Sequence, residues 1–155
     1  MIKRCTFKTK SEGETKELGE LLGKLLPEGA LLVLKGDLGC GKTVLTKGIA
    51  RAFSVPEEDV SSPSFNIVHE YPSFVHIDLY RLSCSEEVYD LGLEELLSDE
   101  RVKVIEWGEI AGELLENPIV VECKDKGGER LFKIYDPEGK ICGKLKELWR
   151  ERCQG

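Results

Sequence analysis

The spacing of apolar residues in the first third of the chain predicts alternating strands and helices. Residues 2–9 alternate weakly between polar and apolar, as a strand does, and leucines recur at helical spacing from Glu14 to Leu26. Pro27 and Gly29 end that pattern, and an uninterrupted apolar run at 30–35 predicts a buried strand. A second helical pattern covers residues 42–53. The predicted order is therefore strand, helix, strand, loop, helix.

The remaining two thirds predict shorter elements around a long loop. Residues 54–64 contain two prolines and little periodicity, and irregular loops of this length are often functional. Two strands, "FNIVHEY" and "FVHIDLY", are joined by a turn at Pro72 and Ser73. Further elements are predicted as a helix at 85–97, a strand at 102–107, a hairpin around 126–129 and a basic amphipathic helix ending near 152. Strands and helices in this order favour an α/β fold with a mixed sheet.

Length and composition fit one folded domain. A chain of 155 residues with 41% hydrophobic and 33% charged residues can bury a real core but is short for two domains. The longest apolar stretch is far shorter than a membrane span, and the first residues lack a hydrophobic signal core. We expect a cytoplasmic protein that makes no contact with membranes.

The cysteine spacing argues against a zinc site, and the net charge argues against direct binding of nucleic acid. The six cysteines form no C-x-x-C pair, and the two histidines cannot complete a zinc-finger spacing, so reduced thiols are expected. The net charge of −7 disfavours a protein that grips nucleic acid by itself, because cationic side chains supply most non-specific affinity. Any link to RNA or DNA would need a partner that holds the strand.

The sequence "GDLGCGKT", residues 36–43, fits the phosphate-binding pattern G-x-x-x-x-G-K-[ST] at every fixed position. A strand precedes it and a helix follows, as the motif requires. Successive backbone amides of such a loop and the positive end of the helix dipole favour a phosphate. Lys42 is expected to reach the outer phosphates and the Thr43 hydroxyl to help hold Mg²⁺. The alternative is a glycine-rich turn with an incidental lysine.

Two acidic residues compete as the metal-binding partner of this loop. Asp78 and Glu106 each follow an apolar run and are expected at the carboxyl edge of the sheet, where ligands bind in such folds. Trp107 is interpreted either as plain core or as an aromatic lip on the site. His69 and His76 are expected to be packed or surface residues rather than catalysts.

Four motifs in order, "GDLGCGKT", "SSPSFNIVHEY", "HIDLYRL" and "IEWGE", closely resemble the bacterial TsaE family, the ATPase of tRNA threonylcarbamoyladenosine biosynthesis. The resemblance spans roughly residues 11–135 and includes "ETKELG" at 14–19. It implies a P-loop NTPase-like three-layer sandwich with a mixed, mainly parallel sheet. Residues 1–155 would then form a single P-loop ATPase domain.

The resemblance also implies a function and partners. The protein would bind ATP or ADP with Mg²⁺ and hydrolyse ATP slowly. It would act as a nucleotide-dependent switch for the TsaB and TsaD proteins, and these partners would stimulate its hydrolysis. That pair transfers the threonylcarbamoyl group to adenosine in tRNA, so this chain would meet tRNA only through its partners. The oligomeric state stays open, with a monomer as one possibility.

Residue roles carried over from the family follow the matching positions. Cys40 stands where the family commonly has Ala, and Ser64 replaces the usual Thr. The nucleotide would be bound by Gly36, Asp37, Leu38, Gly39, Cys40, Gly41, Lys42, Thr43 and Val44, with Ser11 or Glu12 and Arg130 near adenine and ribose. Thr43 and Glu106 would hold Mg²⁺, Asp78 would lie near the metal or the attacking water, and Ser62, Pro63, Ser64 and Phe65 would form the switch loop.

Two other functions remain as alternatives. A small-molecule kinase on the same fold needs an acceptor pocket and an arginine-bearing lid, but the lid-like stretch "KDKGGER" has one arginine. The other alternative is a non-enzymatic, nucleotide-gated binding module, for which GTP is disfavoured because the chain contains no N-K-x-D guanine signature. We therefore favour the ATPase.

Overall fold

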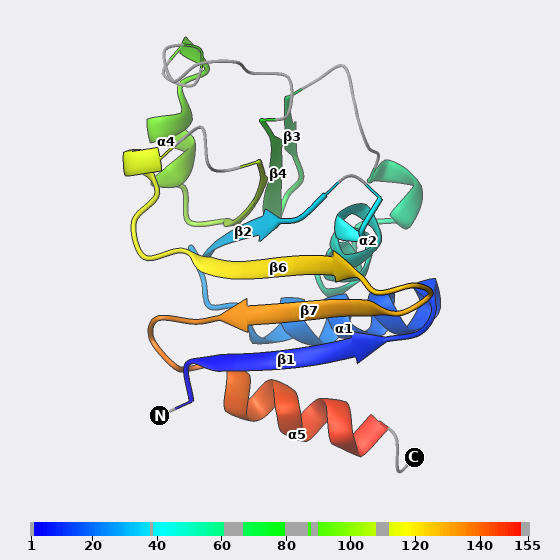
Figure 1. The fold of residues 1–155 in the computed structure, drawn as a ribbon. Coiled ribbons are helices and arrows are strands. Elements are labelled where there is room, and N and C mark those ends of the chain that lie inside the picture. Colours follow the sequence, from blue (N-terminus) through cyan, green and yellow to red (C-terminus); the bar gives the residue numbers. More distant parts are fainter. Residues whose placement is uncertain are drawn as a thin grey trace.

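A mixed β-sheet forms the centre of the computed structural model, which describes residues 2–37, 39–60, 67–79, 87, 90–107 and 112–152. Within these residues seven strands form one sheet in the order β1-β7-β6-β2-β5-β4-β3 (Figure 1). The strands are β1 (Arg4–Thr9), β2 (Leu31–Lys35), β3 (Val68–Glu70), β4 (Phe74–Asp78), β5 (Val102–Glu106), β6 (Ile119–Asp125) and β7 (Arg130–Tyr135).

Parallel pairing occupies the middle of the sheet and antiparallel pairing its two sides. Strand β2 pairs in parallel with both β5 and β6, and β5 pairs in parallel with β4. The hairpins β3-β4 and β6-β7 and the β1-β7 pair are antiparallel. Parallel strands need coverage on both faces. Their carboxyl ends meet at one edge of the sheet.

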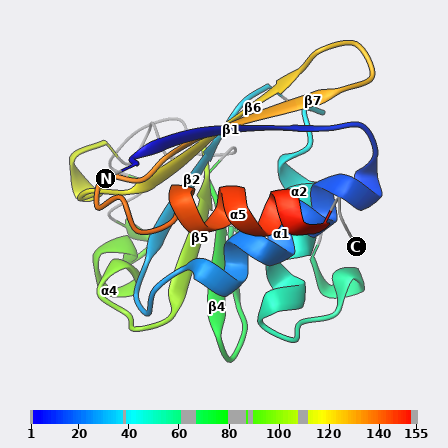
Figure 2. The same ribbon diagram turned by 90° about the horizontal axis from the view of Figure 1, so that it is seen from below.

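Helices cover both faces of the sheet. The helices α1 (Glu12–Leu25), α2 (Lys42–Ala52) and α5 (Cys142–Arg152) share one apolar core with the sheet, and α5 lies against β1 (Figures 1 and 2). On the other face, α4 (Leu93–Leu97) and the short 3-10 helix η3 (Gly112–Leu114) pack on β4 and β5 through a second core. The predicted α/β three-layer fold is confirmed. Among the described helices, none combines the length and apolar character needed to cross a bilayer.

Helices α1 and α2 pack unusually closely because glycines face each other at their crossing. A Cβ atom on Gly19 would lie 2.3 Å from the carbonyl oxygen of Leu45. A Cβ atom on Gly48 would lie 2.2 Å from the carbonyl oxygen of Lys16. The side-chain-free positions therefore let the two backbones touch, which fixes α2 and the loop before it against α1.

Two predicted segments differ in detail from the structure. The loop predicted for residues 54–64 contains the 3-10 helix η1 (Glu57–Asp59) in its described part. The helix predicted for 85–97 is interrupted, because Gly92 adopts a left-handed backbone conformation (φ 72°) and α4 begins after it. The described parts of the other predicted strands and helices are confirmed with shifts of a few residues at their ends, whereas residues 65–66, 80, 85–86 and 88–89 of the predicted elements lie outside the described residues.

The expectation of reduced thiols is wrong for two of the six cysteines. Cys5 on β1 and Cys142 at the start of α5 form a disulfide between residues 137 positions apart. Helix α5 packs on β1, and this tertiary contact brings the two cysteines together. Cys40 and Cys123 are free and buried.

Candidate nucleotide-binding site

The glycine-rich loop lies at the carboxyl end of β2, in the middle of the sheet. Gly36, Gly39 and Gly41 have φ angles of 141°, 82° and 121°, which side chains other than glycine rarely adopt. At Gly36 space is also limiting, because a Cβ atom there would lie 2.5 Å from the carbonyl oxygen of Cys123. These positive φ angles turn the loop back toward the start of α2, as a phosphate-binding nest requires.

Helix α2 presents its N-terminus to this loop. Gly41 is the residue that precedes the helix, and no side chain of the described residues caps it. The amides of Lys42, Thr43 and Val44 belong to the first turn, where helical hydrogen-bond partners do not exist. Such a turn attracts an anion through its free amides and the helix dipole.

Lys42 is buried, with 6% of its surface exposed. It donates a hydrogen bond to the carbonyl oxygen of Gly36 at 2.5 Å and lies 4.1 Å from the centroid of the Trp107 ring. Trp107 has a left-handed φ of 62°, which is uncommon for a residue with a side chain. Trp107 also packs against the second apolar core, so both interpretations of this residue, core and aromatic lip, stay open.

Asp78 and Glu106 are brought together at the ends of two neighbouring strands. They are direct register partners on the parallel strands β4 and β5, and Glu106 also pairs in register with Leu34 of β2. Asp78 is half-buried, whereas Glu106 is 3% exposed. The strand that leads into the phosphate-binding loop therefore lies next to one acid, and the second acid lies one strand further.

His76 is part of this cluster, although the sequence analysis expected only a packed or surface residue. Its Nε2 atom lies 2.7 Å from Oε2 of Glu106, and both side chains are buried. The other ring nitrogen, Nδ1, is buried without a hydrogen-bond partner among the described residues. The available signal was the spacing, because His76 and Asp78 are two positions apart and so share one face of β4.

One end of the β1-β7 pair carries the residues expected near adenine and ribose, which are Ser11, Glu12 and Arg130. The Ser11 hydroxyl accepts a hydrogen bond from the amide of Glu14 at 3.1 Å, so it caps helix α1, which begins at Glu12. Arg130 pairs with Asp125 at 2.5 Å, and this hydrogen-bonded pairing lowers the pKa of Asp125. The Arg130 side chain also reaches the loop, because a Cβ atom on Gly41 would lie 3.8 Å from its Cδ.

Several predicted site residues lie outside the described residues. These are Leu38 of the phosphate-binding loop and the whole predicted switch loop, Ser62, Pro63, Ser64 and Phe65. Asp37 and Gly39, on either side of Leu38, are exposed. The structure therefore describes the rest of the glycine-rich loop, the start of α2 and the two acids Asp78 and Glu106. The predicted switch loop lies outside the described residues.

The donor chemistry of the cluster fits Mg²⁺. In the described part of the chain no three His, Cys, Asp or Glu side chains form a metal cage. Mg²⁺ does not require one, because it usually keeps several waters and takes one or two carboxylates plus phosphate oxygens. The Thr43 hydroxyl, Asp78 and Glu106 offer oxygen ligands of this kind.

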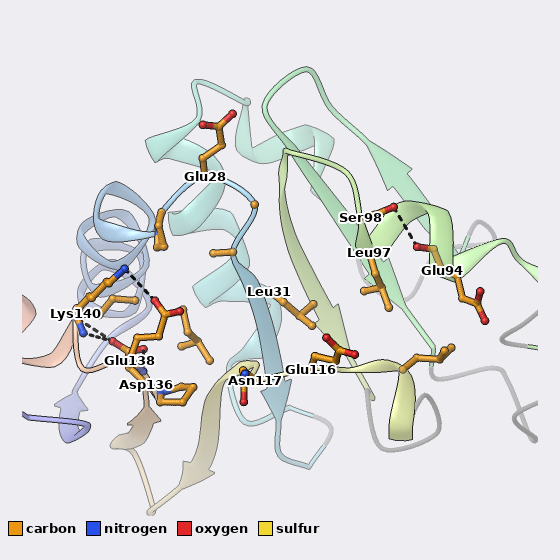
Figure 3. Close-up of a pocket in the computed structure, with 17 residues that line it drawn as sticks. Glu28, Leu31, Glu94, Leu97, Ser98, Glu116, Asn117, Asp136, Glu138 and Lys140 are labelled. Carbon is orange, nitrogen blue, oxygen red and sulfur yellow. Dashed lines mark hydrogen bonds and ion pairs between the residues drawn. The ribbon is translucent and has the colours of Figure 1, made fainter.

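A pocket of about 820 Å³ lies at the opposite end of the parallel strands (Figure 3). Leu31 and Ile119, the first residues of β2 and β6, line it together with acidic side chains such as Glu94 and Glu116. The length of β2 separates this pocket from the glycine-rich loop. It therefore does not supply the acceptor site that a kinase would need beside the phosphates.

The sequence of this chain is similar to those of known proteins. Residues 9–132 match the family described as "Threonylcarbamoyl adenosine biosynthesis protein TsaE". A protein of that name from Rickettsia bellii is 38% identical over 136 residues, which cover 85% of this chain and 88% of the relative. The protein of the same name from Treponema pallidum is 37% identical, covering 78% of this chain and 90% of the relative.

The fold is also similar to a solved structure. The crystal structure of YdiB from Bacillus subtilis superposes with a TM-score of 0.75 and 27% sequence identity. The superposition covers 98% of this chain and 97% of that chain. The likeness therefore extends over the whole α/β architecture, including the strands that carry the candidate site.

Proposed function

Because the chain belongs to the TsaE family of tRNA threonylcarbamoyladenosine biosynthesis proteins, we propose that it is the accessory ATPase of that modification. In this proposal residues 1–155 form one P-loop ATPase domain. It works in the cytoplasm with the TsaB and TsaD proteins and hydrolyses ATP slowly on its own. It touches tRNA only through those partners.

The observation that carries this proposal is the arrangement around Lys42. The residue stands at the start of α2 behind three glycines with positive φ, and Asp78 and Glu106 end two neighbouring parallel strands. Trp107, the residue after Glu106, lies 4.1 Å from the Lys42 ammonium, so the lysine, the helix-start amides and the two carboxylates belong to the same edge of the sheet. This combination suits a nucleotide whose phosphates need neutralising and whose attacking water needs orienting.

Each group has a role in this chemistry. The amides of residues 39–44 would bind the phosphates, and Lys42 would leave the Gly36 carbonyl to neutralise charge on the outer phosphate. Asp78, the more accessible acid, would orient the attacking water. Ser11 or Glu12, with Arg130, would lie toward the adenine and ribose.

Thr43 and Glu106 would hold Mg²⁺, which supplies charge neutralisation across the phosphates when it is bound. We expect loss of Glu106 to weaken Mg²⁺-dependent ATP binding more than loss of Asp78. Titrating Mg²⁺ into Glu106→Gln and Asp78→Asn at fixed ATP measures this difference. The reverse order would exchange the roles of the two acids.

Hydrolysis is tested with two lysine variants on the same helix. Lys42→Ala should lower the rate of phosphate release about 10²-fold, because charge stabilisation in the transition state is lost. Lys47→Ala, five residues along α2 and half-exposed, is the matched control and should keep the wild-type rate. A near-normal rate for Lys42→Ala would contradict the proposed site.

The switch is tested by co-purification with TsaB and TsaD in ATP and in ADP. A nucleotide-dependent switch should be retained by its partners in one nucleotide and released in the other. The wild-type protein and Lys42→Ala are compared, because the variant should lose the difference. Retention that is the same in ATP, in ADP and without nucleotide would overturn the switch.

A further inference from the structure

Two free cysteines lie in contact beneath the glycine-rich loop. The Cys123 thiol on β6 donates a hydrogen bond to the carbonyl oxygen of Cys40 at 2.8 Å. Both side chains are buried, with exposures of 2% for Cys40 and 3% for Cys123. The two residues are 83 positions apart in the sequence, so only the fold brings them together.

The glycines of the loop pack directly on this thiol pair. A Cβ atom on Gly36 would lie 2.7 Å from Sγ of Cys40 and 3.2 Å from Cβ of Cys123. A Cβ atom on Gly41 would lie 3.7 Å from Sγ of Cys123. The two sulfur-bearing side chains thus fill the space under the loop, between its first and last glycine.

We propose that Cys40 and Cys123 form a reversible disulfide under oxidation by a peroxide, and that this bond switches off nucleotide binding at the neighbouring loop. The control of nucleotide binding rests on the proposed function, whereas formation of the disulfide does not. The chain already contains one disulfide, between Cys5 on β1 and Cys142 on α5. Cys40 and Cys123 would be a second, regulated pair.

The chemistry needs hydrogen peroxide as the oxidant and two displacement steps. The Cys40 thiolate attacks one peroxide oxygen, the O–O bond breaks, and the departing hydroxide takes a proton to give water. Cys123 then attacks the Cys40 sulfur, which forms the S–S bond and expels the second hydroxide as water. Two electrons pass from the two sulfurs to the peroxide, and both thiol protons end in the two waters.

Cys40 is the better nucleophile of the pair. Hydrogen bonding with the Cys123 thiol and the positive charge of Lys42 lower the pKa of Cys40. The same hydrogen bonding and burial raise the pKa of Cys123, which therefore serves as the resolving thiol. A small oxidant is required because neither sulfur is exposed at the surface.

A disulfide would change the loop because its geometry differs from that of a hydrogen-bonded pair. Sulfur atoms in a disulfide are about 2.05 Å apart, so Cys40 must move toward β6. The S–H donor to the Cys40 carbonyl is lost at the same time. Cys40 precedes Gly41 and Lys42 directly, so its displacement misplaces the amides and the ammonium that face the phosphates.

The experiment treats the full-length protein with hydrogen peroxide and maps its tryptic peptides after blocking free thiols. The expected cross-link joins residues 36–42 to residues 104–124, and it differs in mass from the Cys5–Cys142 cross-link between residues 5–8 and 141–144. Calorimetry with ATP is run on the same samples before oxidation, after it, and after dithiothreitol. We expect oxidation to weaken ATP binding about tenfold or more, with recovery on reduction.

A single variant serves as the control. Cys123→Ala should bind ATP as the reduced protein does and should keep that affinity after peroxide treatment. Absence of the 36–42 to 104–124 cross-link, or a cross-link that leaves ATP affinity unchanged, would overturn the inference. Failure of the reduced protein to bind ATP would instead refute the proposed function, while the peptide map still decides whether the disulfide forms.

Discussion

The Nε2 atom of His76 lies 2.7 Å from Oε2 of Glu106, and both side chains are almost completely buried. Removing one partner of a buried pair leaves the other without compensation, so His76→Leu should lower the free energy of unfolding by about 3 kcal/mol. Urea denaturation monitored by circular dichroism measures this loss. The double variant His76→Leu/Glu106→Gln should regain part of it, because no buried charge then remains.

An exposed pair provides the comparison. Lys24 lies 3.8 Å from Glu20 on α1, and the two side chains are 60% and 36% exposed. Lys24→Ala should cost only about 0.5 kcal/mol or less. If His76→Leu costs no more than this, Glu106 does not depend on His76 for its place in the fold.

The contact between Lys42 and Trp107 predicts a fluorescence signal for nucleotide binding. A phosphate that draws the Lys42 ammonium away from the indole ring removes a cation–π contact at 4.1 Å. The other tryptophan, Trp149, packs on Phe7 and Arg152, so Trp149→Phe leaves Trp107 as the single tryptophan. Its emission should change on titration with ATP. An unchanged spectrum under conditions where calorimetry detects binding would contradict this prediction.

The crossing of α1 and α2 predicts opposite effects for two glycine-to-alanine changes. Alanine normally favours a helix over glycine by about 1 kcal/mol. Gly48→Ala should nevertheless destabilise the protein, because the new methyl group would collide with the Lys16 carbonyl. Gly143→Ala on α5 meets open space and should be neutral or stabilising by about 0.5 kcal/mol. Thermal unfolding of the two variants measures the sign, and a stabilising Gly48→Ala would refute the close crossing.

The hydrogen bonds of Asp99 predict part of the loss of folding stability at acid pH. Its carboxylate accepts hydrogen bonds from the Arg101 guanidinium and backbone amide, which hold the pKa of Asp99 well below its usual range. A carboxyl whose pKa is lowered in the folded state adds stability above its unfolded pKa of about 4, and this is lost as pH falls further. Asp99→Asn should therefore lower the melting temperature at pH 7, and its difference from wild type should shrink progressively as the pH falls below about 4.

The control for this change is Glu100→Gln, an exposed acid on the same turn. The plot of its melting temperature against pH should stay parallel to that of the wild-type protein across the same pH range. If the melting temperatures of Asp99→Asn and of the wild-type protein fall equally steeply as the pH is lowered below about 4, the role assigned to Asp99 is contradicted.

The sequence predicted the elements and the loop because both depend on local pattern. Periodicity located β2 and α2, and the fixed spacing of Gly36, Gly41 and Lys42 predicted the loop between them. The positions of Asp78 and Glu106 after apolar runs were sufficient to predict two acids at one sheet edge. Their direct register followed from parallel pairing of β4 and β5.

What the sequence did not predict depends on contacts between distant segments. Cys123 carries no motif, and only the β2-β6 pairing puts it under the loop that contains Cys40. The Cys5–Cys142 disulfide likewise depends on α5 packing against β1. His76 looked like a packing residue because its partner lies on another strand, 30 residues away.

The disulfide between Cys5 and Cys142 also bears on the order in which the chain reaches its final state. Strand β1 precedes α1, β2 and α2 along the chain, but its partner β7 and the helix that carries Cys142 follow all three. A chain folding as it emerges from the ribosome can assemble α1, β2 and α2 while β1 still lacks its ladder partner. The residues of β1 therefore wait for their ladder partner longer than the elements that follow them, and the Cys5–Cys142 bond can form only after α5 has been made.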